Sequence, residues 1–129
     1  MFTYQKKDKL KSRKQTQFLF SNGHSINAFP IKLIYTIEST PELTEGLLQA
    51  GVGAPSRIFR KAVSRNRVKR LLRESYRLQK PNFFTQIQLA QKKVSLFFLY
   101  TDKIVLTQKE IEDKLSFALT QLAQKINKI

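Results

Sequence analysis

The clearest hydrophobic pattern lies towards the C-terminal end of the chain. Residues 94–100 (VSLFFLY) are continuously apolar, which predicts a strand buried in the middle of a sheet. Thr107 and Glu110 then form a capping-box pattern that predicts the start of a helix. Apolar residues follow at helical spacing: Ile111, Leu115, Ala118, Leu119, Leu122 and Ile126. We predict an amphipathic helix packed on the sheet; a membrane-bound helix is the alternative, which the acidic first turn disfavours.

Two further strands are predicted in the first half. Residues 31–37 (IKLIYTI) are apolar and rich in β-branched side chains. Residues 47–54 (LLQAGVGA) form a second candidate, weakened by two glycines and ended by Pro55. Residues 38–46 contain a proline and a glycine, so we expect a loop between these strands.

Two more helices complete the pattern. Residues 15–22 (QTQFLFSN) predict a short helix that ends at Gly23. Residues 62–80 predict a longer helix that ends at Pro81, because the residue before a proline disfavours helical geometry. Residues 82–93 fit either a loop or a helical turn.

The order of helix, strands, helix, strand and helix predicts an α+β sandwich, with the helices packed on one small sheet. Hydrophobic residues make up 41% of the 129 residues, which suffices for one core. We expect a single domain over residues 15–129. Residues 1–14 predict a flexible basic arm, with cationic side chains at Lys6, Lys7, Lys9, Lys11, Arg13 and Lys14.

The charge of the chain points to a polyanionic partner. Lys and Arg total 24 and Asp and Glu only 9, which gives a net charge of +15. Nucleic acid is the first candidate, followed by an anionic membrane surface and an acidic protein. The absence of cysteine excludes disulfides, thiolate zinc sites and a cysteine nucleophile. We find no secretory signal, and expect a soluble, cytoplasmic protein.

Residues 57–77 (RIFRKAVSRNRVKRLLRESYR) carry most of this charge in one segment. As a helix, the segment directs an apolar set towards a core, namely Val68, Leu71, Leu72 and Tyr76. The opposite side carries Asn66, Arg70, Arg73 and Arg77, which cluster within roughly 60° of arc. Arg67 and Lys69 flank this stripe, and Arg57, Arg60 and Lys61 extend it into the preceding loop.

Such a stripe suits phosphate recognition. Guanidinium groups offer forked donors that match phosphate oxygens, and neutralising phosphates releases condensed counterions. A solvated helix face is the alternative, but such faces normally mix signs, and Glu74 is the only acid between residues 57 and 77. Helical spacing allows Glu74 to pair with either Arg70 or Arg77.

Residues 61–74 resemble the signature of the protein subunit family of bacterial ribonuclease P. The family pattern is roughly A-V-x-R-N-R-x-K-R-x-x-R-E, and the run from Ala62 to Glu74 has every fixed position of it. The resemblance implies a two-layer αβββαβα sandwich with a left-handed crossover around the signature helix. It also implies contact with a catalytic RNA, for which the candidates are Arg57, Arg60, Lys61, Arg65, Asn66, Arg67, Lys69, Arg70, Arg73 and Arg77.

The resemblance further implies that the first helix and the sheet hold the single-stranded leader of precursor tRNA. Phe20 matches a family aromatic residue, whereas the aromatic expected four residues earlier is Thr16 here. Phe18 and Tyr35 are further candidates for stacking on bases. Core packing is the alternative for each of these aromatic side chains.

In this family the chemistry belongs to the RNA, with Mg²⁺ ions bound mainly by it. The resemblance therefore implies a subunit of a ribonucleoprotein endoribonuclease, with the catalytic RNA and precursor tRNA as partners and no catalytic residue, metal site or small-molecule substrate of its own. In agreement, acids are scattered and the lone histidine, His24, has no evident partner. The alternatives are a ribosomal or other structural RNA-binding protein, a DNA-binding domain, and a stand-alone nuclease.

Overall fold

Helices and strands follow one another in the order αβββαβα, which confirms the predicted α+β fold class. The computed structural model describes residues 13–39 and 48–127. The elements are α1 (Arg13–Asn22), β1 (His24–Ala28), β2 (Ile31–Ser39), β3 (Leu48–Gly53), α2 (Ala62–Ala90), β4 (Lys92–Tyr100) and α3 (Gln108–Asn127). The predicted arm lies outside the described residues, except that Arg13 and Lys14 begin α1. Most of the predicted loop over 38–46 also lies outside them.

The four strands form one sheet in the order β1-β2-β4-β3. β2 pairs antiparallel with β1 and β4, whereas β3 runs parallel to β4 at the edge. We predicted no element over residues 24–28, and β1 forms there. The strand buries Ile26 and Ala28 and exposes His24, Ser25 and Asn27.

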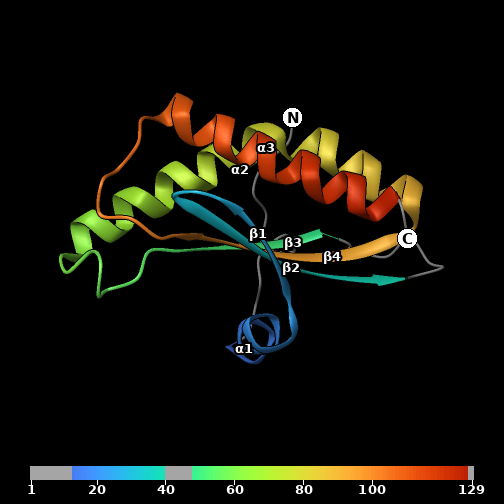
Figure 1. Cartoon of the computed structure of the whole chain (residues 1–129), viewed down its shortest axis with the longest axis horizontal. Coiled ribbons are helices and arrows are strands. Elements are labelled where there is room, and N and C mark those ends of the chain that lie inside the picture. Colours follow the sequence, from blue (N-terminus) through green and yellow to red (C-terminus); the bar gives the residue numbers. More distant parts are fainter. Residues whose placement is uncertain (1–12, 40–47, 128–129) are drawn as a thin grey trace.

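Helices cover both faces of the sheet (Figure 1). α2 and α3 lie side by side on one face, and α1 lies across the other. The core fills the space between the sheet and the α2–α3 pair. On β4, alternate residues from Val94 to Tyr100 are buried in this core, and the intervening residues are half-buried on the α1 side. The two-layer core therefore carries α1 as a third layer.

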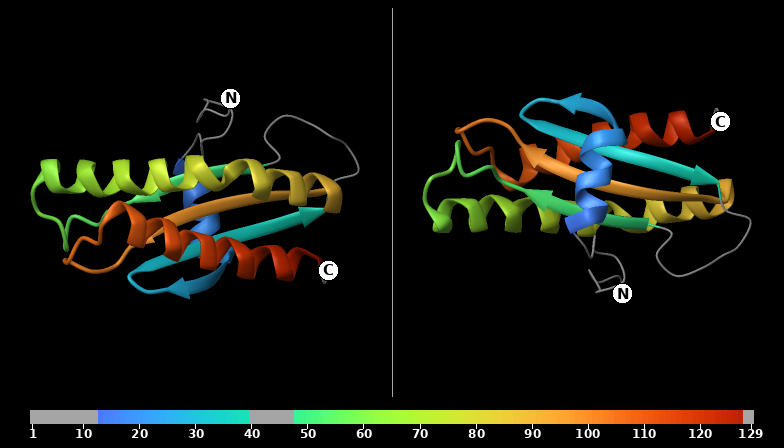
Figure 2. Two further views of the ribbon diagram at one scale, coloured as in Figure 1. Left: turned by 90° about the horizontal axis from the view of Figure 1, so that it is seen from above. Right: turned by 90° about the horizontal axis from the view of Figure 1, so that it is seen from below.

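The connection from β3 through α2 to β4 is left-handed, as the resemblance implied. In Figure 2 (left) the helices face the viewer, β3 and β4 both point to the left, and β4 lies below β3. If the view is turned so that both strands point upward, β4 lies to the left of β3, which is the left-handed arrangement. Connections of this kind are right-handed in nearly all proteins, so the handedness is a distinctive feature of this fold.

α2 is longer than predicted. The prediction that it ends at Pro81 is wrong, because the helix continues to Ala90. Phe83 and Ile87 are buried on the core side of this second half, so packing offsets the hydrogen bond that a proline cannot donate. The helix ends at Gln91, whose left-handed backbone (φ 55°) donates from its N–H to Ile87 and Gln88. Residues 82–90 are thus helical.

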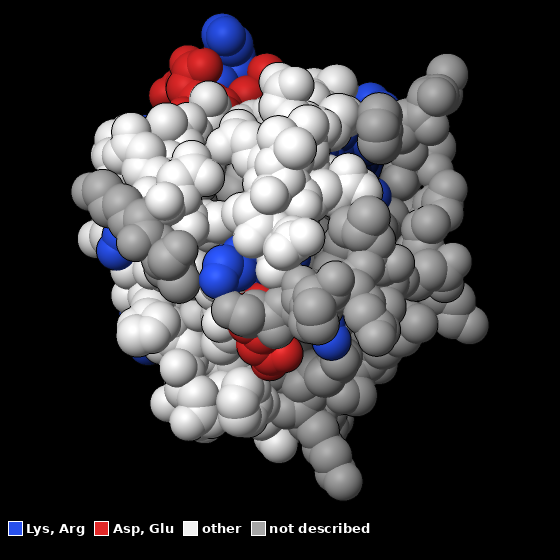
Figure 3. All heavy atoms as spheres, turned by 90° about the vertical axis from the view of Figure 1, so that its right-hand side faces the viewer, with Lys and Arg blue, Asp and Glu red and all other residues white. Residues whose placement is uncertain are grey.

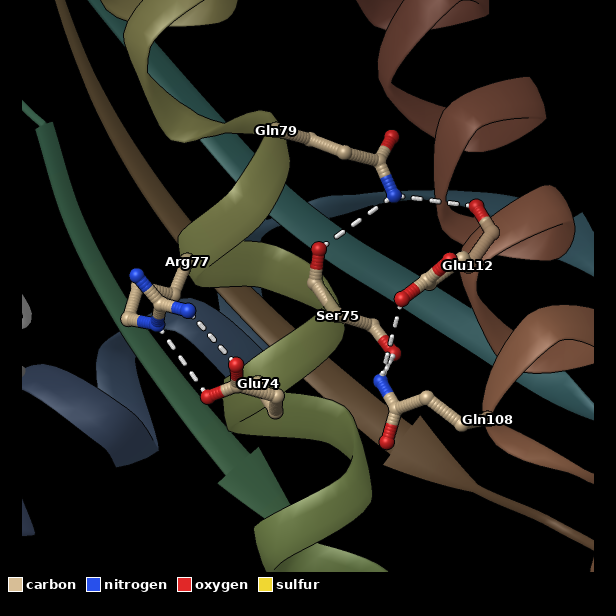
Figure 4. Close-up of polar contacts among 6 residues, drawn as sticks. All are labelled: Glu74, Ser75, Arg77, Gln79, Gln108 and Glu112. Carbon is tan, nitrogen blue, oxygen red and sulfur yellow. Dashed lines mark hydrogen bonds and ion pairs between the residues drawn. The ribbon is translucent and has the colours of Figure 1, made fainter.

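α3 forms as predicted. The backbone N–H of Glu110 donates to Thr107 Oγ1 at 3.2 Å, and the N–H of Thr107 donates to the Glu110 carboxylate at 3.4 Å. All six apolar residues predicted for its core side are buried. Polar contacts also join α3 to α2: Gln108 donates to Ser75 Oγ at 2.7 Å, and Gln79 donates to the Glu112 carbonyl at 2.9 Å (Figure 4).

Candidate RNA-binding surface

The first half of α2 separates apolar from cationic side chains as the helical spacing predicts. Val68, Leu72 and Tyr76 are buried in the core, and Leu71 is half-buried. On the other side, Asn66, Arg70 and Arg73 are exposed and Arg77 is half-buried. α2 meets its neighbour α3 through Ser75 and Gln79. By helical spacing these residues lie opposite the cationic side, which therefore faces away from both the core and α3. We call Asn66, Arg70, Arg73 and Arg77 the basic ridge.

One ridge residue is paired within the protein. Arg77 donates from Nη2 and Nε to the two carboxylate oxygens of Glu74, at 2.6 and 3.1 Å (Figure 4). This hydrogen bonding lowers the pKa of Glu74 and raises that of Arg77. The sequence allowed Glu74 to pair with Arg70 or Arg77, and in the structure it pairs with Arg77. Within the described residues, Arg70 and Arg73 form no ion pair, so their guanidinium groups are open to phosphate.

The loop before α2 is held by Arg65. Its Nη1 donates to the carbonyl oxygens of Phe59 at 2.8 Å and Arg60 at 3.0 Å. The ring of Phe59 is buried against that of Tyr100, with centroids 5.9 Å apart. The exposed side chains of Arg60 and Lys61 therefore start from a fixed backbone.

The predicted RNA-contact residues fall into two groups. The exposed group is Arg57, Arg60, Lys61, Asn66, Arg67, Arg70 and Arg73, and the half-buried group is Arg65, Lys69 and Arg77. All ten lie on one loop and the first sixteen residues of one helix. Their contact with RNA stays a prediction, and Arg65 has the additional structural role described above.

The last turns of α2 and its C-cap are uncharged: residues 82–91 (NFFTQIQLAQ) contain no Lys, Arg, Asp or Glu. Figure 3 views the end of the molecule at which α2 finishes, and scattered charged side chains break an otherwise uncharged described surface. Every cationic residue of α2 thus lies before Pro81, and all except Lys80 lie in the first sixteen residues of the helix.

α1 presents two phenylalanines to solvent. Phe18 and Phe20 are 56% and 49% exposed, whereas Leu19 between them is buried. The ring of Phe20 meets the ring of Phe97 on β4 edge-to-face, with centroids 4.9 Å apart. Gly53 on β3 leaves room for this arrangement, because a Cβ there would lie 2.7 Å from the Phe97 ring. The sequence analysis did not identify Phe97 and Gly53 as the floor beneath Phe20. A glycine inside a strand is a known sign that another group approaches the backbone closely.

Tyr35 occupies a different place from the two phenylalanines. It points to the α2–α3 side of the sheet, is 4% exposed and belongs to the core, in agreement with the core-packing alternative. Its ring lies 5.8 Å from that of His24, which is the neighbour that the sequence did not reveal. Tyr35 and Phe18 both line a pocket of about 520 Å³ at the sheet edge. The Thr16 side chain lies outside the described residues.

Two absences hold for the described part of the chain. No helix there is long and apolar enough to span a lipid bilayer. Nor do three or more histidine or acidic side chains gather there in an arrangement that could hold a metal ion.

The fold and the surface together define an α+β protein with one cationic helix face, which is the chemistry expected of a protein that binds a polyanion. Comparison with known proteins makes this class specific. The sequence model of the family described as Ribonuclease P matches residues 4–127, so the chain belongs to the ribonuclease P protein family. Its members are the protein component of the enzyme that processes the 5′ end of tRNA, which decides against the structural RNA-binding, DNA-binding and stand-alone nuclease alternatives.

Individual relatives agree. The ribonuclease P protein component of Porphyromonas gingivalis W83 is 27% identical over 122 residues, which cover 95% of this chain and 88% of the relative. The fold is similar to that of the Staphylococcus aureus RNase P protein (TM-score 0.66, 17% identity, covering 89% of this chain and 94% of that one). It is also similar to that of the Thermotoga maritima protein (TM-score 0.65, 18% identity, covering 88% and 96%).

Proposed function

We propose that the basic ridge and the loop before α2 bind the catalytic RNA of ribonuclease P, while α1 and the adjoining sheet hold the leader of precursor tRNA. The observation that carries this proposal is the open guanidinium pair of Arg70 and Arg73 on a helix face that no other described element covers. Forked donors at these positions match phosphate oxygens, and their charge releases counterions from the RNA.

The leader surface is supported by a separate observation. The exposed ring of Phe20 stands beside Phe97, and the edge strand next to them has only a glycine at residue 53. An unpaired base can stack on an exposed aromatic side chain. The missing side chain at residue 53 leaves room for the Phe97 ring that lies beside Phe20.

Under this proposal the protein adds no catalytic group. The chemistry would come from Mg²⁺ held by the RNA, which would activate the attacking water. The cationic side chains of the protein would reduce the repulsion between phosphates. Holding the leader then favours precursor over mature tRNA. The reaction takes place in the cytoplasm, where precursor tRNA and the catalytic RNA meet the protein.

Reconstitution with the catalytic RNA of the same organism tests this division of labour. We expect no cleavage of precursor tRNA by the protein alone. With the RNA present, the protein should lower the Mg²⁺ concentration needed for half-maximal cleavage. Cleavage by the protein without RNA, or an unchanged Mg²⁺ requirement, would overturn the proposal.

Phe20→Ala tests the leader surface within the same assay. We expect the reconstituted enzyme to lose part of its preference for precursor over mature tRNA, by about fivefold or more if one stacked base is lost. Phe117→Ala is the matched control, because Phe117 is 52% exposed on α3, on the opposite side of the sheet. Equal effects of the two substitutions would contradict a leader site at Phe20.

A further inference from the structure

A second hollow lies on the α1 face of the sheet, on the other side of α1 from Phe20. Its volume is about 330 Å³, and Phe18 and Leu19 form its α1 wall. The floor comes from Thr36 and Glu38 of β2, Ser95 and Lys93 of β4, and Gln49 of β3. The size is in the range of pockets that hold small ligands.

The floor of this pocket is polar, unlike the surface beneath Phe20. Thr36 is the direct cross-strand partner of Ser95, and Glu38 is that of Lys93. Two residues beyond Ser95 on β4, the same face carries Phe97, whose partner on β2 is Ile34. α1 crosses this face of the sheet (Figure 2, right). Phe18 on α1 lines the polar pocket, whereas Phe20 contacts Phe97. The sheet face therefore offers two chemically different surfaces.

Gln49 indicates what the polar part lacks. Gln49 is 8% exposed, and its Oε1 is buried with no hydrogen-bond partner in the part of the chain that the structure describes. Native proteins leave few buried polar atoms unsatisfied, and such atoms call for an explanation. Because Gln49 lines the pocket, a ligand there that donates a hydrogen bond would satisfy this oxygen.

The side chains around Gln49 restrict which class of ligand the pocket can bind. The Glu38 carboxylate only accepts hydrogen bonds, and it repels phosphate and other anions. Phe18 offers an exposed ring at the wall, on which a planar group can stack. A planar ligand edged with donors meets both demands, and Lys93 beside it can contact the phosphate of the same nucleotide.

We propose that this pocket is a second RNA subsite, which binds one unpaired nucleobase and favours guanine. Guanine presents N1–H and one N2–H side by side, which match the two oxygens of the Glu38 carboxylate. The second N2–H remains for Gln49 Oε1. Adenine and cytosine present an amino group beside an acceptor nitrogen, and uracil presents one imino donor between two carbonyls. This inference rests on the proposed RNA-binding function and adds base selectivity to it.

The test uses the full chain and labelled uridine pentamers, with uracil, guanine or inosine at the central position. Fluorescence anisotropy gives the dissociation constant of each. We expect the guanine pentamer to bind at least about fivefold more tightly than the uracil pentamer. Inosine lacks the N2 amino group, so the inosine pentamer should fall between them.

Variants locate the effect. Gln49→Leu removes the acceptor at nearly constant volume, so guanine preference should fall while the melting temperature stays equal or rises. Glu38→Gln, at an exposed position, should also reduce the preference, and it serves as a second test if Gln49→Leu folds poorly. Phe18→Ala should weaken binding of all three pentamers, whereas Phe117→Ala, with a matched exposure of 52%, should change none.

The outcomes are decisive in both directions. No guanine preference in the unmodified protein, or a preference that persists in both Gln49→Leu and Glu38→Gln, would overturn the subsite. Binding of the catalytic RNA is measured separately with Arg70→Ala/Arg73→Ala, which should keep the guanine preference. Loss of the preference with normal reconstituted cleavage would contradict only the subsite, and failed reconstitution with intact preference would contradict only the proposed function.

Discussion

The guanidinium of Arg65 donates a hydrogen bond from Nη1 to the carbonyl oxygen of Phe59 at 2.8 Å. Arg65 is thereby an anchor for the loop before α2, in addition to being a candidate for RNA contact. Arg65→Ala should lower the free energy of unfolding by about 1–2 kcal/mol, because it removes hydrogen bonds to two backbone carbonyls. Thermal melting measures the change. Arg67→Ala is the control, since Arg67 is exposed, and an equal loss in both variants would exclude the anchoring role.

Arg70→Ala/Arg73→Ala should separate binding from stability. We expect affinity for the catalytic RNA to fall roughly tenfold, and the slope of log affinity against log salt to decrease by about two. The melting temperature should stay close to that of the unmodified protein, because both side chains are exposed. Lys109→Ala/Lys114→Ala on α3 removes the same charge elsewhere and should have a smaller effect. Unfolding of the Arg70/Arg73 variant would show that the ridge is structural.

Glu74→Gln should strengthen RNA binding. The substitution removes a negative charge and releases Arg77 from the carboxylate that now accepts two of its hydrogen bonds. We expect affinity for the catalytic RNA to rise about two- to fivefold and the salt slope to steepen by about one. Salt titrations of both proteins provide the measurement. Weaker binding by Glu74→Gln would mean that the pair holds Arg77 in its RNA-binding position.

Tyr100→Phe should destabilise the connection between β4 and α3. The Tyr100 hydroxyl donates to the Ile104 carbonyl at 2.8 Å and accepts from the Leu106 N–H at 2.9 Å. Losing both contacts should cost about 1–3 kcal/mol in the free energy of unfolding. Denaturant unfolding at pH 7 measures this difference, and an unchanged midpoint would contradict it.

The same phenol predicts a pH dependence. Burial raises the pKa of Tyr100 above its ordinary value of 10.0. Its contribution to stability is therefore complete below pH 10.0 and is lost as the pH rises towards the folded-state pKa. The stability difference between the unmodified protein and Tyr100→Phe should narrow above that pH. A difference that stays constant to pH 11 would mean that the hydroxyl does not titrate in this range.

Gly53→Ala should disturb the floor beneath Phe20. The added Cβ would lie 2.7 Å from Cε1 of Phe97, and this clash should cost about 1–3 kcal/mol. Combining it with Phe97→Ala makes room for the methyl group. Thermal melts of the two single variants and of the double variant provide the test. The loss of stability in the double variant should be smaller than the sum of the losses in the two single variants. Additive effects would exclude the contact.

The sequence predicted the elements in which periodicity and burial agree. The capped start of α3 and the buried side of α2 are examples, because long amphipathic helices repeat their signal over many turns. β1 escaped notice because its alternation rests on only Ile26 and Ala28. Pro81 misled the prediction for a different reason: local backbone preference favoured an end, but burial of Phe83 and Ile87 outweighed it.

For the site, the sequence could identify the cationic residues but not their partners. Spacing left Glu74 with two possible arginines, and only side-chain geometry distinguishes them. The contact of Arg65 with Phe59 depends on how the preceding loop turns, which no local pattern encodes. The position of Tyr35 follows from strand register, since the opposite parity would have placed it beneath α1.

The uneven distribution of charge along α2 gives this helix a dipole moment in addition to its net charge. All cationic residues of this helix lie before Pro81, and its macrodipole places further positive potential at the same end. Under the proposed function, the field of an approaching RNA would therefore turn the start of α2 towards it before contact. At physiological salt this field extends only about 8 Å, so it orients the protein only when the RNA is already near. Added salt should therefore weaken both the orientation and the binding.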